Sequence, residues 1–259
     1  MKTIEKQKAE VASGPAVSPV FAKGLNLYKL IWVFTVGSVL GYLLETVWFF
    51  LQSGHYICRQ GVVFGPISEI YGFGAVLLTL SLYRIRHKSA VWVFLFSGIL
   101  GASFEYFSSY FQEKIFGTIS WNYSDQPFNL HGRTSLAFVV VWGVLGLIFI
   151  KHMYPFLSNL VEKIPVHTGK VLTLGIAIFM ILDLGVSGLA VWRQTQRRAD
   201  IPSTNFVTDW LDAWFPDAFM EQIYTGVTVV GQGSPLPASP PASDIEKAPF
   251  APKIDCAAT

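Results

Sequence analysis

The sequence predicts an all-α membrane protein, a polytopic bundle of five transmembrane helices with flexible termini. Hydrophobic residues make up 52% of the 259 residues and charged residues only 14%, whereas about a quarter of the residues in a soluble domain are charged. The mean hydropathy of +0.44 agrees with this class. Five apolar stretches each approach the roughly 20 residues that a helix needs to cross the hydrocarbon core. They cover residues 28–51, 66–83, 91–111, 135–156 and 170–192.

The polar segment 1–27 precedes the first apolar stretch. It contains Gly14, Pro15 and Pro19 and lacks the apolar core of a signal peptide. We expect it to be a flexible arm on the cytoplasmic side. The second apolar stretch is the shortest and opens at Pro66, a residue that suits the first position of a helix because its missing N–H would lack a partner there.

The lysines and arginines near the helix ends predict the orientation, because cytoplasmic loops carry an excess of both. With the N-terminus inside, eleven lie on the cytoplasmic side: Lys2, Lys6, Lys8, Lys23, Lys29, Arg84, Arg86, Lys88, Lys151, Lys163 and Lys170. Six lie on the outer side: Arg59, Lys114, Arg133, Arg193, Arg197 and Arg198. This bias favours a multi-pass protein with its N-terminus inside and its C-terminus outside.

The segment 193–230 after the fifth stretch contains a short amphipathic pattern. Its apolar residues follow the i, i+3, i+4, i+7 spacing of a helix that lies on a membrane interface: Val207, Trp210, Leu211 and Trp214. Residues 231–259 are rich in Pro, Ala and Ser, so we expect a disordered tail. The two cysteines, Cys58 and Cys256, are too few for a disulfide framework, and whether they pair with each other is left open.

A repeat with an offset of sixty residues places two glutamates at equivalent positions. Leu40, Gly41, Glu45 and Gln52 match Leu100, Gly101, Glu105 and Gln112. Each glutamate comes six residues before the predicted outer end of its helix, which is about 9 Å at 1.5 Å per residue. The match predicts a parallel two-helix repeat, as in other duplicated transport folds.

Glu69, one turn into the second stretch, and Asp183, in the fifth, bring the number of intramembrane acids to four. Such a charge costs at least a few kcal/mol unless it faces a bundle interior, a cavity or a partner. No Lys or Arg lies at the centre of an apolar stretch. The neutralising partners are therefore residues of the outer loops, a bound cation or bound protons.

The two outer loops, residues 55–66 and 121–133, offer such partners. Arg59 comes from the first loop, and Asn129, His131 and Arg133 alternate in the second. If both loops fold inward, Arg59 and Arg133 could each pair bidentately with a glutamate. We expect an acidic, arginine-lined cavity that opens to the outer side. Its residues would be Glu45, Glu105, Arg59, Arg133, His131, Asn129, Glu69 and Asp183.

Paired loop motifs resemble those of the putative ABC-transporter type IV family of bacterial membrane proteins. They are Gly61–Pro66 with Tyr71–Gly74, and Trp121–Ser124 with Pro127–Arg133. The resemblance covers roughly residues 28–192 and implies a permease of the bacterial cytoplasmic (inner) membrane. It implies neither a substrate nor catalytic residues.

A transport role would make Glu45 and Glu105 a cation or proton site, with Arg59, His131 and Arg133 controlling access. The sequence contains no G-x4-G-K-[ST] loop, so any ATP would be hydrolysed by a separate ATPase subunit. The predicted cytoplasmic loops, near residues 84–90 and 157–169, are short for docking such a subunit. They suit a secondary transporter or a small partner subunit better.

Two other classes remain open. A membrane-embedded enzyme could act on a lipid-linked or amphiphilic substrate, with the acids as general acid and base and Arg133 as an anion clamp. The absence of a nucleophile motif argues against it. A non-transporting assembly or sensor protein would use the acids only as a structural ion-pair network. No cofactor is expected, no histidine motif supports a metal at Glu45, Glu105 and His131, and the net charge of +2 gives no reason to expect nucleic acid.

Overall fold

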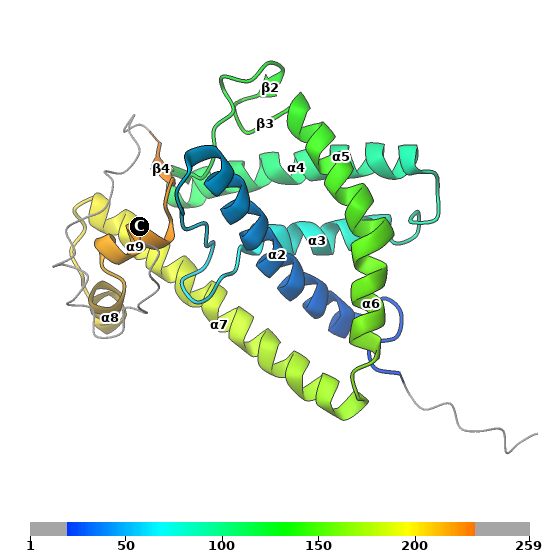
Figure 1. The fold of residues 1–259 in the computed structure, drawn as a ribbon. Helices are drawn as coiled ribbons and strands as arrows, with labels where there is room; N and C mark the ends of the chain where they lie inside the picture. Colours follow the sequence, from blue (N-terminus) through cyan, green and yellow to red (C-terminus); the bar gives the residue numbers. More distant parts are fainter. Residues whose placement is uncertain (1–19, 231–259) are drawn as a thin grey trace, which may run out of the picture.

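The computed structural model describes residues 20–230, and most of them are helical (Figure 1). The predicted flexible arm, residues 1–27, is described from residue 20 onward, and there Phe21 and Ala22 are buried in the hydrophobic core. The rest of the predicted arm, the predicted tail 231–259 and Cys256 lie outside the described residues. The helices are α2 (Leu27–Ser53), α3 (Glu69–Leu82), α4 (Ala90–Phe116), α5 (Leu136–Ile148), the π-helical η1 (Phe149–Met153), α6 (Tyr154–Glu162), α7 (Val166–Arg198), α8 (Phe206–Trp214) and α9 (Asp217–Ile223).

Two short antiparallel strand pairs join the ends of the helices. Strand β1 (Thr118–Ile119) pairs with β4 (Thr228–Val229), with Thr118 opposite Val229. Strand β2 (Asn129–Leu130) pairs with β3 (Thr134–Ser135) in the connection between α4 and α5. The first pair attaches the C-terminal part of the described chain to the end of α4.

Within residues 20–230, four helical segments are long and apolar enough to cross a membrane: Leu27–Ser53, Ala90–Phe116, Leu136–Glu162 and Val166–Arg198. The predicted membrane helix bundle is therefore confirmed, but the count of five transmembrane helices is not. Helix α3 has 14 residues, which is about 21 Å at 1.5 Å per residue, shorter than a hydrocarbon core of about 30 Å. Pro66 does not begin this helix, because it follows a turn at Gly65, where φ is 85°, and α3 starts only at Glu69.

The fifteen residues before α3 fold back between the helices, and we call residues 54–68 the re-entrant segment. The Val63 N–H donates to Ser187 Oγ at 2.8 Å, and the Phe64 N–H donates to Asp183 Oδ1 at 3.1 Å. The Ser68 N–H donates to the carbonyl of Ser38, in the middle of α2, at 3.1 Å. Irregular backbone inside a membrane protein is tolerated where protein groups satisfy it in this way. Helix α3 therefore begins about halfway along α2.

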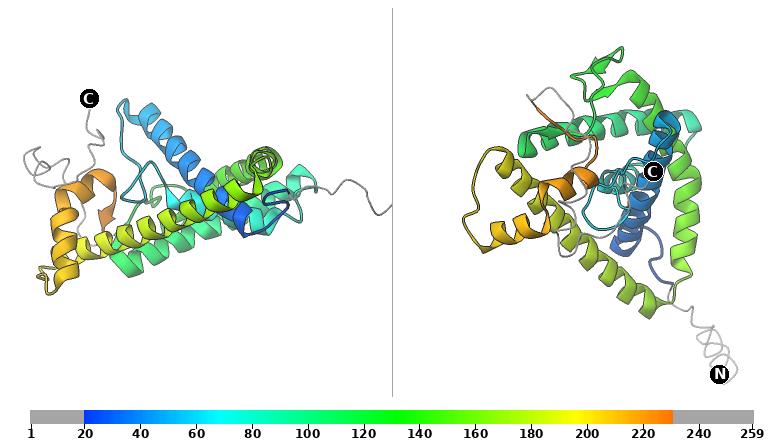
Figure 2. Two further views of the ribbon diagram at one scale, coloured as in Figure 1. Left: turned by 90° about the horizontal axis from the view of Figure 1, so that it is seen from below. Right: turned by 60° about the vertical axis from the view of Figure 1, so that its left-hand side comes forward.

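Helices α2, α4 and α7 run in the same general direction (Figures 1 and 2). Their C-terminal ends lie on the side that carries α8, α9 and β4. We call residues 199–230 the cap, and this side the capped side. Helices α3 and α5–α6 lead the chain back to the opposite side. The re-entrant segment and the short helix α3 together therefore cross the bundle where the sequence predicts one full transmembrane helix.

The pairs α2–α3 and α4–α5 approach closely at glycines. A Cβ added to Gly41 would lie 2.2 Å from Tyr71 Cβ, and one added to Gly101 would lie 2.4 Å from Trp142 Cγ. Gly72, next to Tyr71, and Gly143, next to Trp142, likewise leave no room for a Cβ. Small residues at such positions let helix backbones come together. In both helix pairs, a glycine thus packs against an aromatic residue of the next helix, an arrangement we call the glycine interlock. The two glycines, Gly41 and Gly101, are sixty residues apart, like the other positions of the repeat.

The cap is part of the folded core. Its apolar side chains pack with Val63 at the tip of the re-entrant segment and with Ala190 of α7; they are Leu211, Phe215, Phe219, Met220 and Ile223. Leu211 is completely buried, so the apolar face predicted to rest on an interface is turned partly toward the protein. Asp212 on the other face pairs with Arg193 and Arg197 of α7.

Candidate functional site

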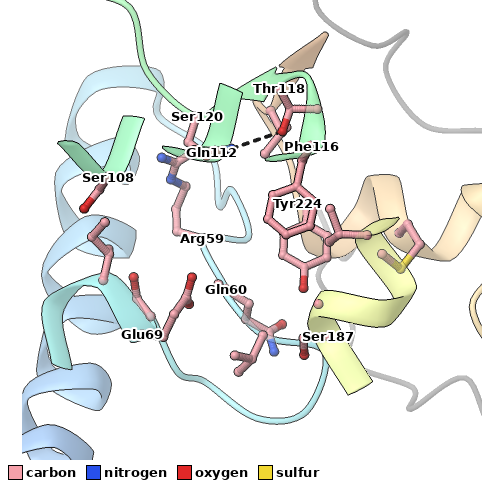
Figure 3. A pocket seen from close by; sticks show the side chains of 18 of the residues that line it. Arg59, Gln60, Glu69, Ser108, Gln112, Phe116, Thr118, Ser120, Ser187 and Tyr224 are labelled. Atoms are coloured by element: carbon pink, nitrogen blue, oxygen red, sulfur yellow. Dashed lines mark hydrogen bonds between the residues drawn. The ribbon is translucent and has the colours of Figure 1, made fainter. Parts of the chain in front are cut away.

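A cavity of about 380 Å³ lies between the helices and the cap (Figure 3). Its walls come from α2, the re-entrant segment, α3, α4, α7 and the cap. In Figure 3, Glu69 and Arg59 lie on one side of it, and Tyr224 and Ser187 lie on the other. The cavity therefore joins residues that are far apart in the sequence.

Glu45 of α2 and Arg59 of the first outer loop form an ion pair, as the sequence predicts. Arg59 Nε lies 3.3 Å from Glu45 Oε2, and the Tyr71 hydroxyl donates to Glu45 Oε1 at 3.3 Å. The pairing uses one guanidinium nitrogen instead of two, because Arg59 Nη1 donates to the carbonyl of Thr225 at 3.0 Å. Arg59 thus neutralises Glu45 and also connects it to the cap.

Glu69 lies in the first turn of α3 and lines the cavity. Its Oε2 atom is buried and has no hydrogen-bond partner among residues 20–230. The carboxylate fits against Gly61, where a Cβ would lie 1.7 Å from Oε2. The positive end of the helix dipole at the start of α3 offsets part of its charge. The uncompensated part faces the cavity.

Glu105 is satisfied in a different way from Glu45. It accepts hydrogen bonds from the Tyr123 hydroxyl at 3.1 Å and from Thr134 Oγ1 at 2.8 Å. Burial and the neighbouring Glu105 raise the pKa of the Tyr123 hydroxyl, so this group stays protonated and donates.

The cavity lining contains Glu45 and Glu69 but does not extend to Glu105. Tyr71 lies near enough to both repeat-related acids to interact electrostatically with Glu45 and Glu105. The two glutamates of the repeat do not line this cavity together. The acid that shares the cavity with Glu45 is Glu69.

The predicted residues of the second outer loop lie away from the cavity lining. Arg133 forms an ion pair with Glu113, two turns beyond Glu105, and donates to Ser109 Oγ at 3.2 Å. His131 is exposed, and its Nδ1 lies 2.9 Å from the Tyr106 hydroxyl. Sequence spacing could not distinguish Glu113 from Glu105 as the partner, because both project from the same end of α4.

Asn129 stabilises the turn of the second outer loop. Its amide donates to the carbonyl of Gln126 at 2.8 Å, and its Oδ1 accepts from the Gly132 N–H at 2.9 Å. Gly132 has a φ of 67° and lies against Asn122 and Ser124, where a Cβ would clash. The side chain of Asn129 is therefore used for hydrogen bonds within the loop.

Asp183 holds the re-entrant segment. It is 2% exposed, and its Oδ1 accepts from the Phe64 N–H at 3.1 Å and from Ser187 Oγ at 3.2 Å. These bonds satisfy irregular backbone that helix α7 would otherwise leave unpaired. A main-chain partner leaves no signature in the sequence, which is why Asp183 looks isolated there.

Replacing Asp183 by leucine should destabilise the protein by about 1–3 kcal/mol, because Phe64 and Ser187 lose their acceptor. Replacing it by asparagine keeps an oxygen acceptor and should cost less. Hydrogen–deuterium exchange of residues 54–68, together with thermal melting, measures both effects. Equal exchange in the two variants would show that Asp183 does not hold this segment.

The sequence does not point to several residues of the cavity. Ser187 and Gln194 line it from α7, and Glu221 and Tyr224 line it from the cap. They have no spacing in common with Glu69, so only the packing of the cap brings them together. Gln112, which belongs to the repeat, also lines the cavity and donates to Ser120 Oγ at 2.8 Å. Within residues 20–230, no group of three or more His, Cys, Asp or Glu side chains could hold a metal ion.

A family model described as putative ABC-transporter type IV matches residues 32–188, more than half of the chain. No curated protein and no solved structure matches the chain. The matched residues run from α2 into α7 and stop before the cap.

Proposed function

Since the chain belongs to the putative ABC-transporter type IV family, we propose that it is the membrane-embedded permease component of a transport system. The cavity beside Glu69 binds the transported solute. The solute reaches it from the capped side, past Arg59 and the residues of the cap.

This proposal rests mainly on the start of helix α3 at Glu69, inside the bundle, after an irregular re-entrant segment. The re-entrant segment and the short helix α3 place a helix N-terminus inside the bundle, next to a cavity and a buried carboxylate oxygen without a partner among the described residues. Transport proteins characteristically build their binding sites from such interrupted helices. Asp183 Oδ2 is likewise buried without a hydrogen-bond partner among the described residues, but Asp183 does not line the cavity, whereas Glu69 does.

The two helix pairs support a duplicated origin of this site. The pairs α2–α3 and α4–α5 share the glycine interlock, and in each pair the glutamate of the repeat follows that glycine by four residues, Glu45 after Gly41 and Glu105 after Gly101. Of these two pairs, only α2–α3 has a second helix that is shortened by a re-entrant segment. We infer that the first unit retained or acquired the binding role, whereas Glu105 stabilises the second.

The capped side corresponds to the outer side of a bacterial cytoplasmic membrane in this proposal. The excess of lysines and arginines on the opposite side supports this orientation. On that opposite side, Lys29 of α2 is fully buried and lies 2.7 Å from Glu162 Oε1 of α6.

The short connections on the inner side of the bundle bear on the energy source in this proposal. The links between α3 and α4 and between α6 and α7 are short, at residues 83–89 and 163–165. They offer little surface for a separate ATPase, so a secondary transport mechanism or a small partner subunit fits the chain better.

The proposal predicts that Glu69→Gln changes the distribution of at least one unmodified compound between medium and cytoplasm. We expect the accumulation ratio to fall by about tenfold, the effect of losing about 1.4 kcal/mol of binding. Mass spectrometry of medium and cell extract, in cells that carry either the wild-type or the variant chain at equal membrane levels, measures it.

Glu113→Gln is the control, because Glu113, like Glu69, is a half-buried glutamate, but it is paired with Arg133 and does not line the cavity. It should leave the distribution unchanged. A compound whose mass changes only with the wild-type chain would instead indicate an enzyme. If neither a distribution nor a mass depends on Glu69, the transport proposal is wrong and a structural role replaces it.

A further inference from the structure

We propose that the cavity binds a small organic ammonium ion, with the cationic group between Glu69 and the aromatic side chains of the wall. This inference rests on the proposed function and names the class of solute. It follows from the charge, the aromatic lining and the unpartnered groups of the cavity.

The charge around Glu69 favours a cation. Arg59 pairs with Glu45, and Arg198 interacts electrostatically with Glu221 of the cap. No ion pair involves Glu69 within the described part of the chain. Glu45 and Asp183 lie near enough to Glu69 to interact with it electrostatically, and both are acidic. A bound cation would relieve this accumulation of negative charge, whereas an anion would increase it.

The aromatic lining favours an organic cation. Phe111, Phe116, Trp121 and Tyr224 all line the cavity, and the face of an aromatic ring attracts an ammonium group. Phe116 and Tyr224 lie across the cavity from Glu69, with the Tyr224 hydroxyl directed toward Ser187 (Figure 3). An ammonium ion between them meets a carboxylate on one side and aromatic rings on the other.

A hard metal ion suits this arrangement less well. Calcium takes six to eight oxygen ligands, and magnesium needs a tight octahedral set. Both carboxylate oxygens of Glu45 already accept hydrogen bonds from Arg59 and Tyr71, so Glu69 is left as the main oxygen donor. The volume of about 380 Å³ is in the range of sites for small organic molecules, which start at about 300 Å³.

Gln194 indicates a second feature of the ligand. This residue is 5% exposed and lines the cavity, and its Nε2 has no hydrogen-bond partner among the described residues. A buried amide donor without a partner is costly unless a ligand or water satisfies it. We therefore infer that the ligand carries an oxygen acceptor in addition to its ammonium group, as in an amino alcohol or a betaine.

The cap contributes to recognition in this chain. Tyr224 and Glu221 lie outside residues 32–188, which the family model matches. The family core supplies the acid, and the cap supplies part of the aromatic wall. Ligand preference should therefore depend on both.

Choline and its uncharged analogue 3,3-dimethylbutan-1-ol test the proposal, because they share shape and hydroxyl group and differ in charge. We expect choline to raise the melting temperature of the purified full-length protein and to bind measurably by calorimetry up to about 10 mM, a range that detects millimolar affinity. The neutral analogue should have no effect. Ethanolamine is a second probe, for a cavity that prefers a primary ammonium group.

Three variants measure the contributions of the carboxylate and of the aromatic ring to choline binding separately. Glu69→Gln should weaken choline binding by about tenfold, because a charge-assisted contact is lost. Tyr224→Leu should weaken it by about threefold through the loss of a cation–π contact. Glu113→Gln, outside the cavity, should bind like the wild type. Circular dichroism and gel filtration establish that each variant is folded, and Tyr224→Leu keeps the test valid if Glu69→Gln fails to fold.

The ammonium group could belong to a free solute or to a lipid headgroup such as ethanolamine. Native mass spectrometry of protein reconstituted with phosphatidylethanolamine or with phosphatidylglycerol distinguishes the two sources. Retention of phosphatidylethanolamine that Glu69→Gln abolishes and free choline competes away identifies the headgroup as ligand. Binding of choline without such retention identifies a free solute.

Equal binding of choline and its neutral analogue would overturn the inference, as would the absence of binding of choline, ethanolamine and phosphatidylethanolamine by the folded wild type. The proposed transport role is tested separately by the distribution of compounds in cells. If Glu69→Gln changes the distribution of a compound that has no ammonium group, the transport role stands and the ammonium ligand is wrong.

Discussion

Replacing Gly41 by alanine should lower the free energy of unfolding by about 3 kcal/mol, at the upper end of the usual cost of overpacking. The new Cβ would lie 2.2 Å from both Cβ and Cγ of Tyr71, and these atoms are too near the backbone to move aside. Helices α2 and α3 would have to separate. The displacement would also break the hydrogen bond from Tyr71 to Glu45. Thermal melting in detergent measures the loss.

Gly185→Ala is the matched control for this prediction. Gly185 lies inside α7, where a Cβ would meet nothing within 4 Å. Alanine there should be neutral or should stabilise by about 0.5–1 kcal/mol, because glycine is the poorer helix former. Gly101→Ala, which would meet Trp142 at 2.4 Å, should resemble Gly41→Ala. If Gly41 and Gly185 respond alike, close helix packing at Gly41 is not the reason for the glycine.

Replacing Asp212 by asparagine should detach the cap, at a cost of about 3 kcal/mol. Asp212 accepts from Arg193 Nε at 2.8 Å and from Nη2 at 2.7 Å, and from Arg197 Nη1 at 2.6 Å. The Arg193 side chain is only 2% exposed, and removing one partner of a buried ion pair leaves an uncompensated charge. Faster hydrogen–deuterium exchange in residues 206–230 reports the release of the cap.

Asp209→Asn provides the control on the same helix, because Asp209 is exposed and forms no ion pair with the described residues. It should leave the exchange of the cap unchanged. Unchanged exchange in Asp212→Asn would show that the apolar contacts of Leu211 and Phe215 hold the cap without the ion pairs.

The same contact makes the attachment of the cap sensitive to acid. The hydrogen bond from Arg193 lowers the pKa of Asp212 in the folded protein below its ordinary value. Its contribution to stability is therefore complete above the unfolded carboxyl pKa of about 3.9 and is lost as the pH falls through the lower folded value. Acid should accelerate exchange in the cap of the wild type, and Asp212→Asn should remove this pH dependence.

Several features of the fold were predictable because they depend on local composition. The apolar stretches identify the four membrane helices to within two residues at half of their ends and to within six at the others, and the pattern around Leu211 identifies α8. Helix α3 is the exception. Its stretch is apolar enough for a full crossing, but Gly65 turns the chain and the re-entrant segment uses the residues before Glu69 as irregular backbone. Hydropathy reports burial in an apolar environment and does not distinguish lipid from protein as that environment.

The candidate site was predictable only in part. The sequence identified Glu45, Arg59 and Glu69, and the pairing of Glu45 with Arg59 follows from a short connection between them. It also favoured Glu105 as the partner of Glu45, because a repeat places equivalent residues at equal depth. Depth does not determine the direction of a side chain. The structure turns Glu105 toward Tyr123 and Thr134 and brings Glu69 into the cavity beside Glu45.

The sequence by itself determined that this is a membrane helix bundle with buried acids, since hydrophobic runs of membrane-spanning length and the cost of a charge within them are local properties. The tertiary structure alone decided which of these acids line the cavity and what surrounds them. Asp183 is bonded to main chain 119 residues away, Arg133 selects Glu113, and the cap closes a cavity that begins at α2. Such contacts depend on how distant segments meet in space, and no spacing along the chain encodes them.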